Sequence, residues 1–326
     1  MMVTDIRGWL EHRQIGIYVA AVAAAAGAGL VSGGLAGLEG AINPALALML
    51  FVTFQQVPVA EMGRAFGQAR FLVVLLLVNF ILLPLLVALL VRLLPDDPLV
   101  RLGVMLVLLT PCIDYVVTFS HLGRGDARLL LASTPVLLVV QMLLLPLYLR
   151  LFLGQGAAGL VQAGPFLHAF LWLIAVPLLL AFLVQVGAAR SRRGEQLAQG
   201  LGYLPVPATA LVLFIVVAAV VPQLGAAIEG AWRVVPVYIA FAVLAPAIGW
   251  GTGRLFGLAA PAGRAVAFSA GTRNSLVVLP LGLAVPGAVP LLPAIIVTQT
   301  LVELLCELAY IRIMPGLGRA DGQTQS

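Results

Sequence analysis

Charged side chains are scarce in this sequence, and Lys is absent altogether. Only 10% of the 326 residues are charged, whereas 62% are hydrophobic. A water-soluble domain carries about 25% charged residues, so this chain has too few to cover a globule in water. All 18 basic residues are Arg, and they are spread over short connections instead of forming one basic face. The composition therefore argues against a soluble globular protein and against nucleic-acid binding, and it predicts a polytopic membrane protein.

Several chemical motifs are missing as well. The sequence has no Gly-Lys-Ser/Thr P-loop, so nothing indicates ATP hydrolysis. It has no zinc-ligand spacing and no cofactor signature, and we expect neither a cofactor nor an enzymatic activity. The only two cysteines, Cys112 and Cys306, both lie in apolar segments, and nothing indicates a disulfide framework. The first segment lacks a small-residue cleavage site, so we do not expect a cleaved signal peptide.

Ten apolar segments are each long enough to cross a bilayer, whose hydrocarbon core of about 30 Å needs about 20 helical residues. The connections between the segments are short and polar. We place the segments near residues 13–32, 40–58, 71–94, 99–122, 128–153, 165–187, 202–224, 234–256, 264–285 and 290–314.

The distribution of Arg predicts the orientation. If the N-terminus is cytoplasmic, thirteen Arg fall in inside loops and four in outside loops, while Arg273 lies within a segment. Cytoplasmic loops of membrane proteins carry an excess of basic residues. We therefore expect a multi-pass protein of the cell (plasma) membrane with both termini in the cytoplasm.

The two halves of the chain repeat each other. Pro44–Val52 matches Pro207–Ile215 at six of nine positions, with an offset of 163. Two further pairs follow in order, Pro111 with Thr272 and Pro135…Gln141 with Pro293…Gln299, at offsets of 161 and 158. Each half holds five spans, and an odd number turns the second half upside down. The predicted fold is an all-α membrane protein of ten transmembrane helices in two five-helix inverted repeats, with discontinuous helices four and nine crossing at the midplane.

This repeat predicts the domain organisation, which is one integral membrane domain. Residues 1–187 hold the first repeat, with helices one to five within 13–153, and also the sixth helix at 165–187. Residues 188–326 hold helices seven to ten. The hydrophilic stretch 188–196 connects these two parts.

The fourth segment is interrupted near its middle by Thr110, Pro111, Cys112 and Asp114. Pro111 cannot donate the helical hydrogen bond and disfavours helical geometry at Thr110, so the helix breaks there. A proline kink alone is common in membrane helices. A buried carboxylate such as Asp114, however, needs a partner or a function. Cys112 is a soft ligand that can bind a metalloid transiently.

The ninth segment is interrupted by Gly271, Thr272, Arg273, Asn274 and Ser275. The first two residues loosen the helix, and Arg273 lies too far from either end to reach the membrane surface. Breaks at corresponding positions of two repeats point to the substrate site of a transporter. We expect Arg273 to pair with the carboxylate of the fourth segment or to bind an anionic substrate. Asn274 and Ser275 are expected to supply hydrogen bonds to a polar substrate.

The tenth segment carries Gln299, Glu303 and Glu307 at four-residue spacing, which places them on one helix face. Two carboxylates on an inward face can relay protons. Glu303 is therefore a candidate for proton coupling, beside Asp114. For Glu307 the alternative is a position near cytoplasmic water or a pair with Arg312.

These residues resemble those of a known family. Pro111-Cys112-Ile113 is followed, twelve residues after the Cys, by Arg124 in the turn Leu122-Gly123-Arg124-Gly125-Asp126. The combination is similar to that of the arsenical-resistance permeases of the bile acid/sodium symporter superfamily, and Gln141 and Leu301-Val302-Glu303 fit the same pattern. The resemblance implies a core domain and a panel domain, with the fourth and ninth helices crossing at the substrate site. It also implies export of trivalent arsenic by proton antiport, with Cys112 as the key thiol.

The ninth segment departs from the family pattern. Members of the family carry an acidic residue beside an Asn there, whereas this chain has Arg273 before Asn274 and Ser275 after it. The sodium-coupled branch uses a Glu in this stretch as part of a sodium site, and a fixed cation there repels sodium. Asp114 is then expected to supply the missing charge from the other helix.

The leading hypothesis is a secondary active transporter that exports arsenite or antimonite by proton antiport. Its expected partners are a metalloid or another small molecule, the proton in preference to sodium, and the lipid bilayer. The alternative is a sodium- or proton-coupled transporter of an organic anion, such as a bile-acid-like, keto-acid or pantoate-like compound held by Arg273. A membrane sensor or scaffold is a third possibility, which the broken helices disfavour.

Overall fold

A computed structural model describes residues 3–31, 38–56, 67–113, 115–153, 168, 170–220 and 224–318. Within these ranges every regular element is a helix. Hydrocarbon offers the backbone no hydrogen-bond partners, and a helix satisfies its own N–H and C=O groups. The all-helical architecture predicted from the composition is confirmed.

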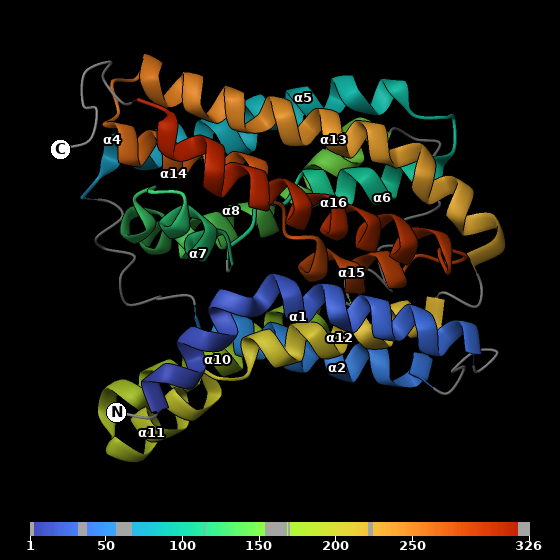
Figure 1. The fold of residues 1–326 in the computed structure, drawn as a ribbon, viewed down its shortest axis with the longest axis horizontal. Helices are drawn as coiled ribbons and strands as arrows, with labels where there is room; N and C mark the ends of the chain where they lie inside the picture. The colour runs from blue at the N-terminus through green and yellow to red at the C-terminus, as the bar shows by residue number, and fades with distance from the viewer. Residues whose placement is uncertain are drawn as a thin grey trace.

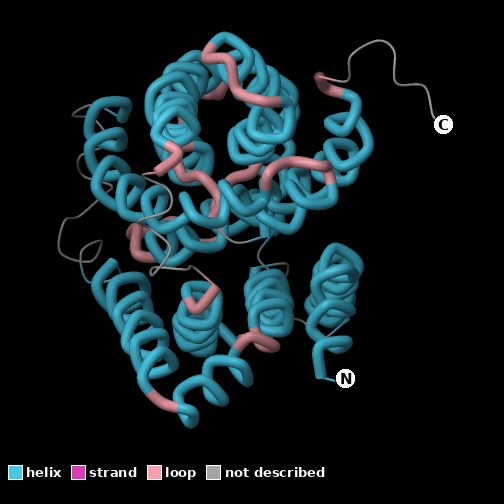
Figure 2. Tube along the Cα trace, turned by 90° about the vertical axis from the view of Figure 1, so that its left-hand side faces the viewer, coloured by secondary structure: helices cyan, strands magenta, loops and turns pink. Residues whose placement is uncertain are grey.

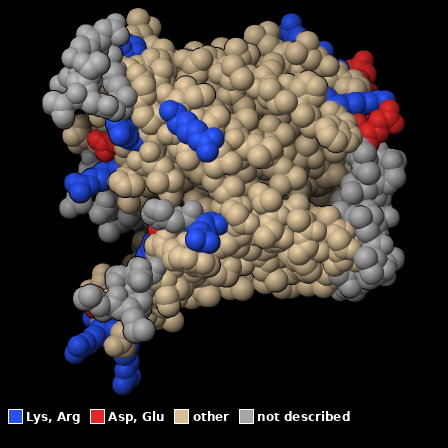
Figure 3. Space-filling model, in the orientation of Figure 1, with Lys and Arg blue, Asp and Glu red and all other residues tan. Residues whose placement is uncertain are grey.

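The surface of the protein is that of a membrane protein. Helices run from side to side in Figure 1, and Figure 3 shows charged side chains gathered toward the two ends of this view, with a largely uncharged face between them. Among the described residues, five helices are long and apolar enough to cross a bilayer, or six if the bent pair Arg192–Leu201 and Pro205–Ala219 counts as one span. The protein is therefore a multi-pass membrane protein, and the total of ten spans stays a prediction.

The first group of helices, called the panel group here, lies along one side of the molecule (Figures 1 and 2). In it α1 contacts α12, α12 contacts α2, and α2 contacts α10. The group consists of α1 (Val3–Val31), α2 (Glu39–Phe54), the π-helix η6 (Leu171–Ala175), α10 (Val176–Arg190), α11 (Arg192–Leu201) and α12 (Pro205–Val220).

The second group, called the core group, holds both interrupted segments. Its α16 contacts α6 and α15 within the group, and it also touches α12 of the panel group. The group consists of α4 (Ala69–Leu77), η3 (Val78–Leu82), α5 (Leu83–Leu90), η4 (Val91–Leu93), α6 (Pro98–Leu108), α7 (Tyr115–Leu122), α8 (Ala127–Leu153), α13 (Leu224–Leu255), α14 (Ala260–Gly271), α15 (Ser275–Leu283), α16 (Leu291–Ile313) and η8 (Met314–Gly316).

The sequence misplaced some boundaries. The segment expected at 13–32 is part of a helix that begins at Val3, where an ion pair between Arg7 and Glu11 at 2.8 Å supports an extra turn. The stretch 188–196 is not a plain polar loop. The hydroxyl of Ser191 accepts a hydrogen bond from the N–H of Gly194 at 3.0 Å, and this cap starts the exposed helix α11.

Helices α13 and α14 pack closely, and this contact helps to position the ninth segment. A Cβ added at Gly249 of α13 would lie 2.9 Å from the Cβ of Ala270 and 3.0 Å from the carbonyl oxygen of Val266. Only a glycine allows the two backbones to approach this far. Because α14 leads directly into the break at Gly271, the contact fixes where that break lies.

Candidate functional site

The two interrupted segments meet at their breaks. The N–H of Cys112 donates to the carbonyl of Thr272 at 3.1 Å, and the N–H of Asn274 donates to the carbonyl of Thr110 at 2.8 Å. Together they form an antiparallel bridge centred on Pro111 and Arg273. Both breaks free backbone groups from helical bonding, and here these groups satisfy one another. Figure 1 shows the four half-helices α6, α7, α14 and α15 extending away from this point.

The guanidinium of Arg273 is completely buried at this crossing. Its Nη2 lies 2.8 Å from Oδ1 of Asn79, 2.5 Å from the carbonyl oxygen of Ser269 and 2.9 Å from that of Ala270. Its Nη1 lies 3.5 Å from the carbonyl of Leu108. Neutral oxygens thus hold the cation, and apart from that of Asn79 they are carbonyls at the C-terminal ends of α6 and α14, where a helix carries partial negative charge.

Asp114 lies outside the described residues, so its predicted ion pair with Arg273 stays a prediction. Among the residues that the structure does describe, no carboxylate forms an ion pair with Arg273, and its Nε has no hydrogen-bond partner. The ring of Phe241 faces the guanidinium at 5.4 Å from the ring centroid, a distance at which a buried cation and an aromatic face attract each other.

Glu303 brings a carboxylate to the crossing from α16. Its Oε2 accepts the backbone N–H of Arg273 at 2.6 Å and Nε2 of Gln299 at 2.6 Å. Its Oε1 accepts the hydroxyl of Tyr115 at 2.5 Å, and that hydroxyl also lies 3.2 Å from the carbonyl of Arg273. A buried carboxylate of the tenth segment thus lies directly at the break in the ninth.

Glu307 lies one helical turn further along α16 and is completely buried. Its Oε1 contacts the hydroxyl of Thr272 at 2.5 Å, while no partner of its Oε2 is found among the described residues. The alternative position near cytoplasmic water, or in a pair with Arg312, is wrong, because Thr272 holds this carboxyl inside the protein. Glu303 and Glu307 thus flank the break in the ninth segment from one helix face.

The remaining predicted site residues are also at the crossing, and all are buried. The hydroxyl of Thr110 donates back to Leu106 at 3.1 Å or Val107 at 2.9 Å, so it stabilises the end of α6. Ser275 shares a hydrogen bond of 2.7 Å with Thr300. Nδ2 of Asn274 has no partner among the described residues, and a buried donor in this state is suited to a substrate or a water.

The two cysteines differ in their surroundings. Cys112 is completely buried beside the bridge, whereas Cys306 is partly buried and lines the large apolar cavity between α13 and α16. No group of three or more His, Cys, Asp or Glu side chains that could hold a metal is found in the described part of the chain. Cys112 is thus the one soft ligand that the described residues place at the crossing.

Asn79 and Tyr115 are site residues that the sequence analysis did not assign. Asn79 is a lone polar residue in a long apolar span and lies in the π-helix η3, an irregularity common at functional sites. Tyr115 directly follows the break in the fourth segment, and its phenol reaches Glu303. The sequence signals that could have identified them were an isolated polar residue in an apolar span, for Asn79, and a hydroxyl next to a helix break, for Tyr115.

The turn Leu122–Asp126 is a structural link. Arg124 adopts a positive φ of 58°, and its carbonyl accepts Nε of Arg264 at 2.8 Å. Oδ1 of Asp126 accepts the N–H of Leu129 at 3.1 Å and so caps α8. The N–H of Asp126 donates to Pro261 at 2.9 Å, which fastens the turn to the start of α14. The turn therefore joins the two interrupted segments at one end of the molecule.

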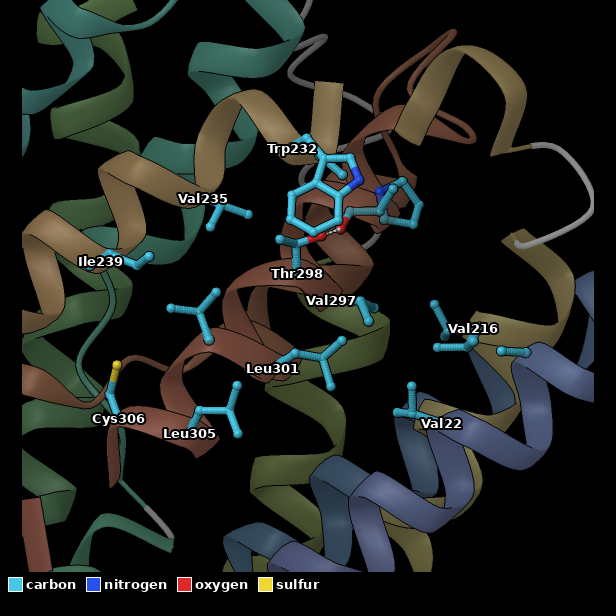
Figure 4. A pocket seen from close by; sticks show the side chains of 16 residues that line it. Val22, Val216, Trp232, Val235, Ile239, Val297, Thr298, Leu301, Leu305 and Cys306 are labelled. Carbon is cyan, nitrogen blue, oxygen red and sulfur yellow. Dashed lines mark hydrogen bonds between the residues drawn. The ribbon is translucent and has the colours of Figure 1, made fainter. Parts of the chain in front are cut away.

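Two cavities lie between the panel and core groups. The larger, of about 730 Å³, is lined by apolar side chains of α1, α12, α13 and α16, and Figure 4 shows Leu301, Leu305 and Cys306 of α16 on one wall. The smaller, of about 30 Å³, is polar and includes Tyr115 and Thr118 of α7 among its lining residues. Because Tyr115 also binds Glu303, this polar crevice adjoins the crossing.

Comparison with known proteins gives one match. A family model described as "Sodium Bile acid symporter family" matches residues 43–229, which is more than half of the chain and includes the first break. A comparison with curated proteins finds no match.

Proposed function

This chain belongs to the sodium bile acid symporter family, and from this premise we propose that it is a secondary transporter that exports arsenite or antimonite in exchange for protons. Membership makes it a carrier of small molecules. The choice of metalloid and proton is the proposal, and the observation that carries it is the buried thiol of Cys112 beside the buried carboxyl of Glu303.

The metalloid is supported by the chemistry of Cys112. Arsenite at neutral pH is As(OH)₃, a small neutral molecule. A thiol condenses with it to form one S–As bond and release one water, and the reverse reaction frees the metalloid. A single soft ligand captures the substrate without the tight hold of several thiolates. The unpaired Nδ2 of Asn274 at the same crossing is a donor for an arsenic-bound hydroxyl.

Proton exchange is supported by the number of charges at the crossing. Two described carboxyl groups, Glu303 and Glu307, share this buried region with one cation, Arg273. An unbalanced buried charge is costly. One proton on the pair makes the cluster neutral, and Glu303 is the better carrier because its oxygen contacts Tyr115, which borders the polar crevice. Asp114 is proposed as a second proton site.

The topology is part of the proposal. We infer ten spans as two inverted five-span repeats in the cell membrane, with both termini cytoplasmic and the bridge near the midplane. Figure 1 supports this view, since α1 begins and α16 ends at the same end of the molecule. A cysteine-accessibility map of the connections, carried out on whole cells, would test the orientation.

The test of the metalloid is an arsenite flux assay in everted vesicles with an imposed pH gradient. Wild type should accumulate arsenite, and Cys112→Ser should not. Cys306→Ser is the matched control, since the same substitution is made at a thiol that lines the apolar cavity and not the bridge. Equal fluxes in Cys112→Ser and wild type would remove the thiol mechanism.

An organic anion is the second candidate, and one observation favours it. Nε of Arg273 and Nδ2 of Asn274 are both buried donors without partners among the described residues. The carboxyl groups of Glu303 and Glu307 at the crossing repel an anionic substrate when they are ionised. The organic anion is therefore the second candidate. Uptake of labelled organic acids that fails in Arg273→Ala and survives in Cys112→Ser would make it the leading function.

A further inference from the structure

The hydrogen bonds of the Arg273 guanidinium place several oxygens around it, as around a bound cation. Nη2 carries two hydrogens, yet three oxygens approach it within 2.5–2.9 Å, from Asn79, Ser269 and Ala270. The carbonyl of Leu108 adds a fourth oxygen near the neighbouring Nη1. More lone pairs than hydrogens converge on this point, as in a coordination shell.

The oxygen of Asn79 is held toward this point by other contacts. Its Nδ2 donates to the carbonyl of Leu75 at 3.0 Å and to the hydroxyl of Ser269 at 3.0 Å. The carbonyl of Leu75 can only accept, so the amide nitrogen must lie on its side and Oδ1 faces the guanidinium, which can only donate. The site is therefore built in advance from the side chain of η3 and the carbonyl end of α14.

Neutral oxygens of this kind bind monovalent cations in transporters. Carbonyls at the ends of half-helices and in unwound segments coordinate coupling ions near the middle of the bilayer. Here the same type of oxygen set surrounds a positive group that belongs to the chain. No free ion can enter while the guanidinium fills the space.

We propose that Arg273 is a built-in replacement for a coupling cation, whose guanidinium permanently occupies an oxygen-lined monovalent-cation site. The carrier then needs no sodium, whichever substrate it moves, and removal of the guanidinium opens the site to a free monovalent cation. Arg273 acts in this role as a positioning residue for the crossing and does not need to touch substrate.

The test uses thermal unfolding of the purified full-length protein at constant ionic strength, in NaCl, LiCl, KCl, methylguanidinium chloride or choline chloride. The unfolding temperature of wild type should be the same in all five salts. Arg273→Ala should unfold at a lower temperature in choline, and Na⁺, Li⁺, K⁺ or methylguanidinium should raise that temperature saturably, by about 2–4 °C.

Two further variants separate the site from general salt effects. Arg273→Met fills the space with an apolar chain and should not respond to any of the cations. Arg273→Ala combined with Asn79→Ala should lose the response, since one of the ligands is gone. A response of equal size in the Met variant would attribute the effect to the salts and overturn the proposal.

Failure to fold is also informative here. The Arg273→Ala variant is prepared in parallel in choline, NaCl and methylguanidinium. Recovery of folded protein only with one of the small cations supports the proposal. A variant that is folded but indifferent to every cation, or unfolded in all of them, overturns it, as does a wild type stabilised by Na⁺ alone. None of these outcomes depends on the transport of arsenite, so the proposed function is tested separately.

Discussion

The backbone N–H of Arg273 donates to Oε2 of Glu303 across 2.6 Å, so the carboxylate of the tenth segment closes onto the break in the ninth. The side chain of the same Arg points to other oxygens, which leaves Glu303 to hold the main chain of the break while the guanidinium holds the ends of the half-helices. The predictions below separate these roles.

Glu303→Gln should uncouple transport from the pH gradient. The amide keeps an oxygen for the N–H of Arg273 but cannot exchange a proton. We expect net arsenite flux driven by an imposed gradient to stop, while exchange of labelled for unlabelled arsenite across the membrane continues. Both are measured in the same everted vesicles, and gradient-driven flux at the wild-type rate would refute the assignment.

Cys112→Ser should abolish arsenite resistance in a sensitive host, whereas Cys306→Ser should leave it intact. An alkoxy oxygen is a harder ligand than sulfur and holds trivalent arsenic less well. Growth in a graded series of arsenite, with protein levels checked by immunoblot, provides the comparison. Resistance lost equally in both variants would point to a packing effect.

Tyr115→Phe should lower both stability and flux. The phenol donates at 2.5 Å to a buried carboxylate, and hydrogen bonds to charged groups contribute about 1.5–3 kcal/mol. Thermal unfolding and arsenite flux are measured together. Tyr148→Phe is the control, since its hydroxyl donates at 2.5 Å to the carbonyl of Phe80 and does not contact Glu303. That variant should lose about 0.5–1.5 kcal/mol of stability and keep its flux. Unchanged flux in Tyr115→Phe would mean that the phenol has a structural role only.

Gly249→Ala should destabilise the protein, while Gly251→Ala should not. The added methyl at Gly249 meets Ala270 and the backbone of Val266 at about 3 Å, whereas nothing lies within 4 Å of the methyl at Gly251. Overpacking of this kind costs about 1–3 kcal/mol, and an unhindered Gly→Ala change in a helix stabilises by up to about 1 kcal/mol. The two unfolding temperatures should therefore move in opposite directions.

The breaks could be predicted from the sequence because each contains residues that no apolar helix tolerates. Pro111 removes a helical hydrogen bond, and Arg273 cannot be left in lipid, so both positions were fixed by local chemistry. Their contact followed from the pairing of the repeats. The hydrogen bonds that join them run from Cys112 to Thr272 and from Asn274 to Thr110. Because both use backbone groups, the residue types at these positions do not predict them.

The carboxylate at the crossing was harder to predict. Sequence spacing put Glu303 and Glu307 on one face of α16 but could not tell which neighbour that face would meet, since this depends on how α16 rotates against α6 and α15. Asp114 lies next to the break in sequence, which made it a candidate from local chemistry alone. The cap at Ser191 that starts α11 was missed for a different reason: a polar Arg-rich stretch suits both a surface helix and a loop.

The bridge between Pro111 and Arg273 has a mechanical consequence. Two backbone hydrogen bonds join the interrupted spans, and neither span can move away from the other without breaking both of these buried bonds. A movement of the panel helices along the apolar face of α16 would break neither bond, so the two joined spans are built to stay together as one unit.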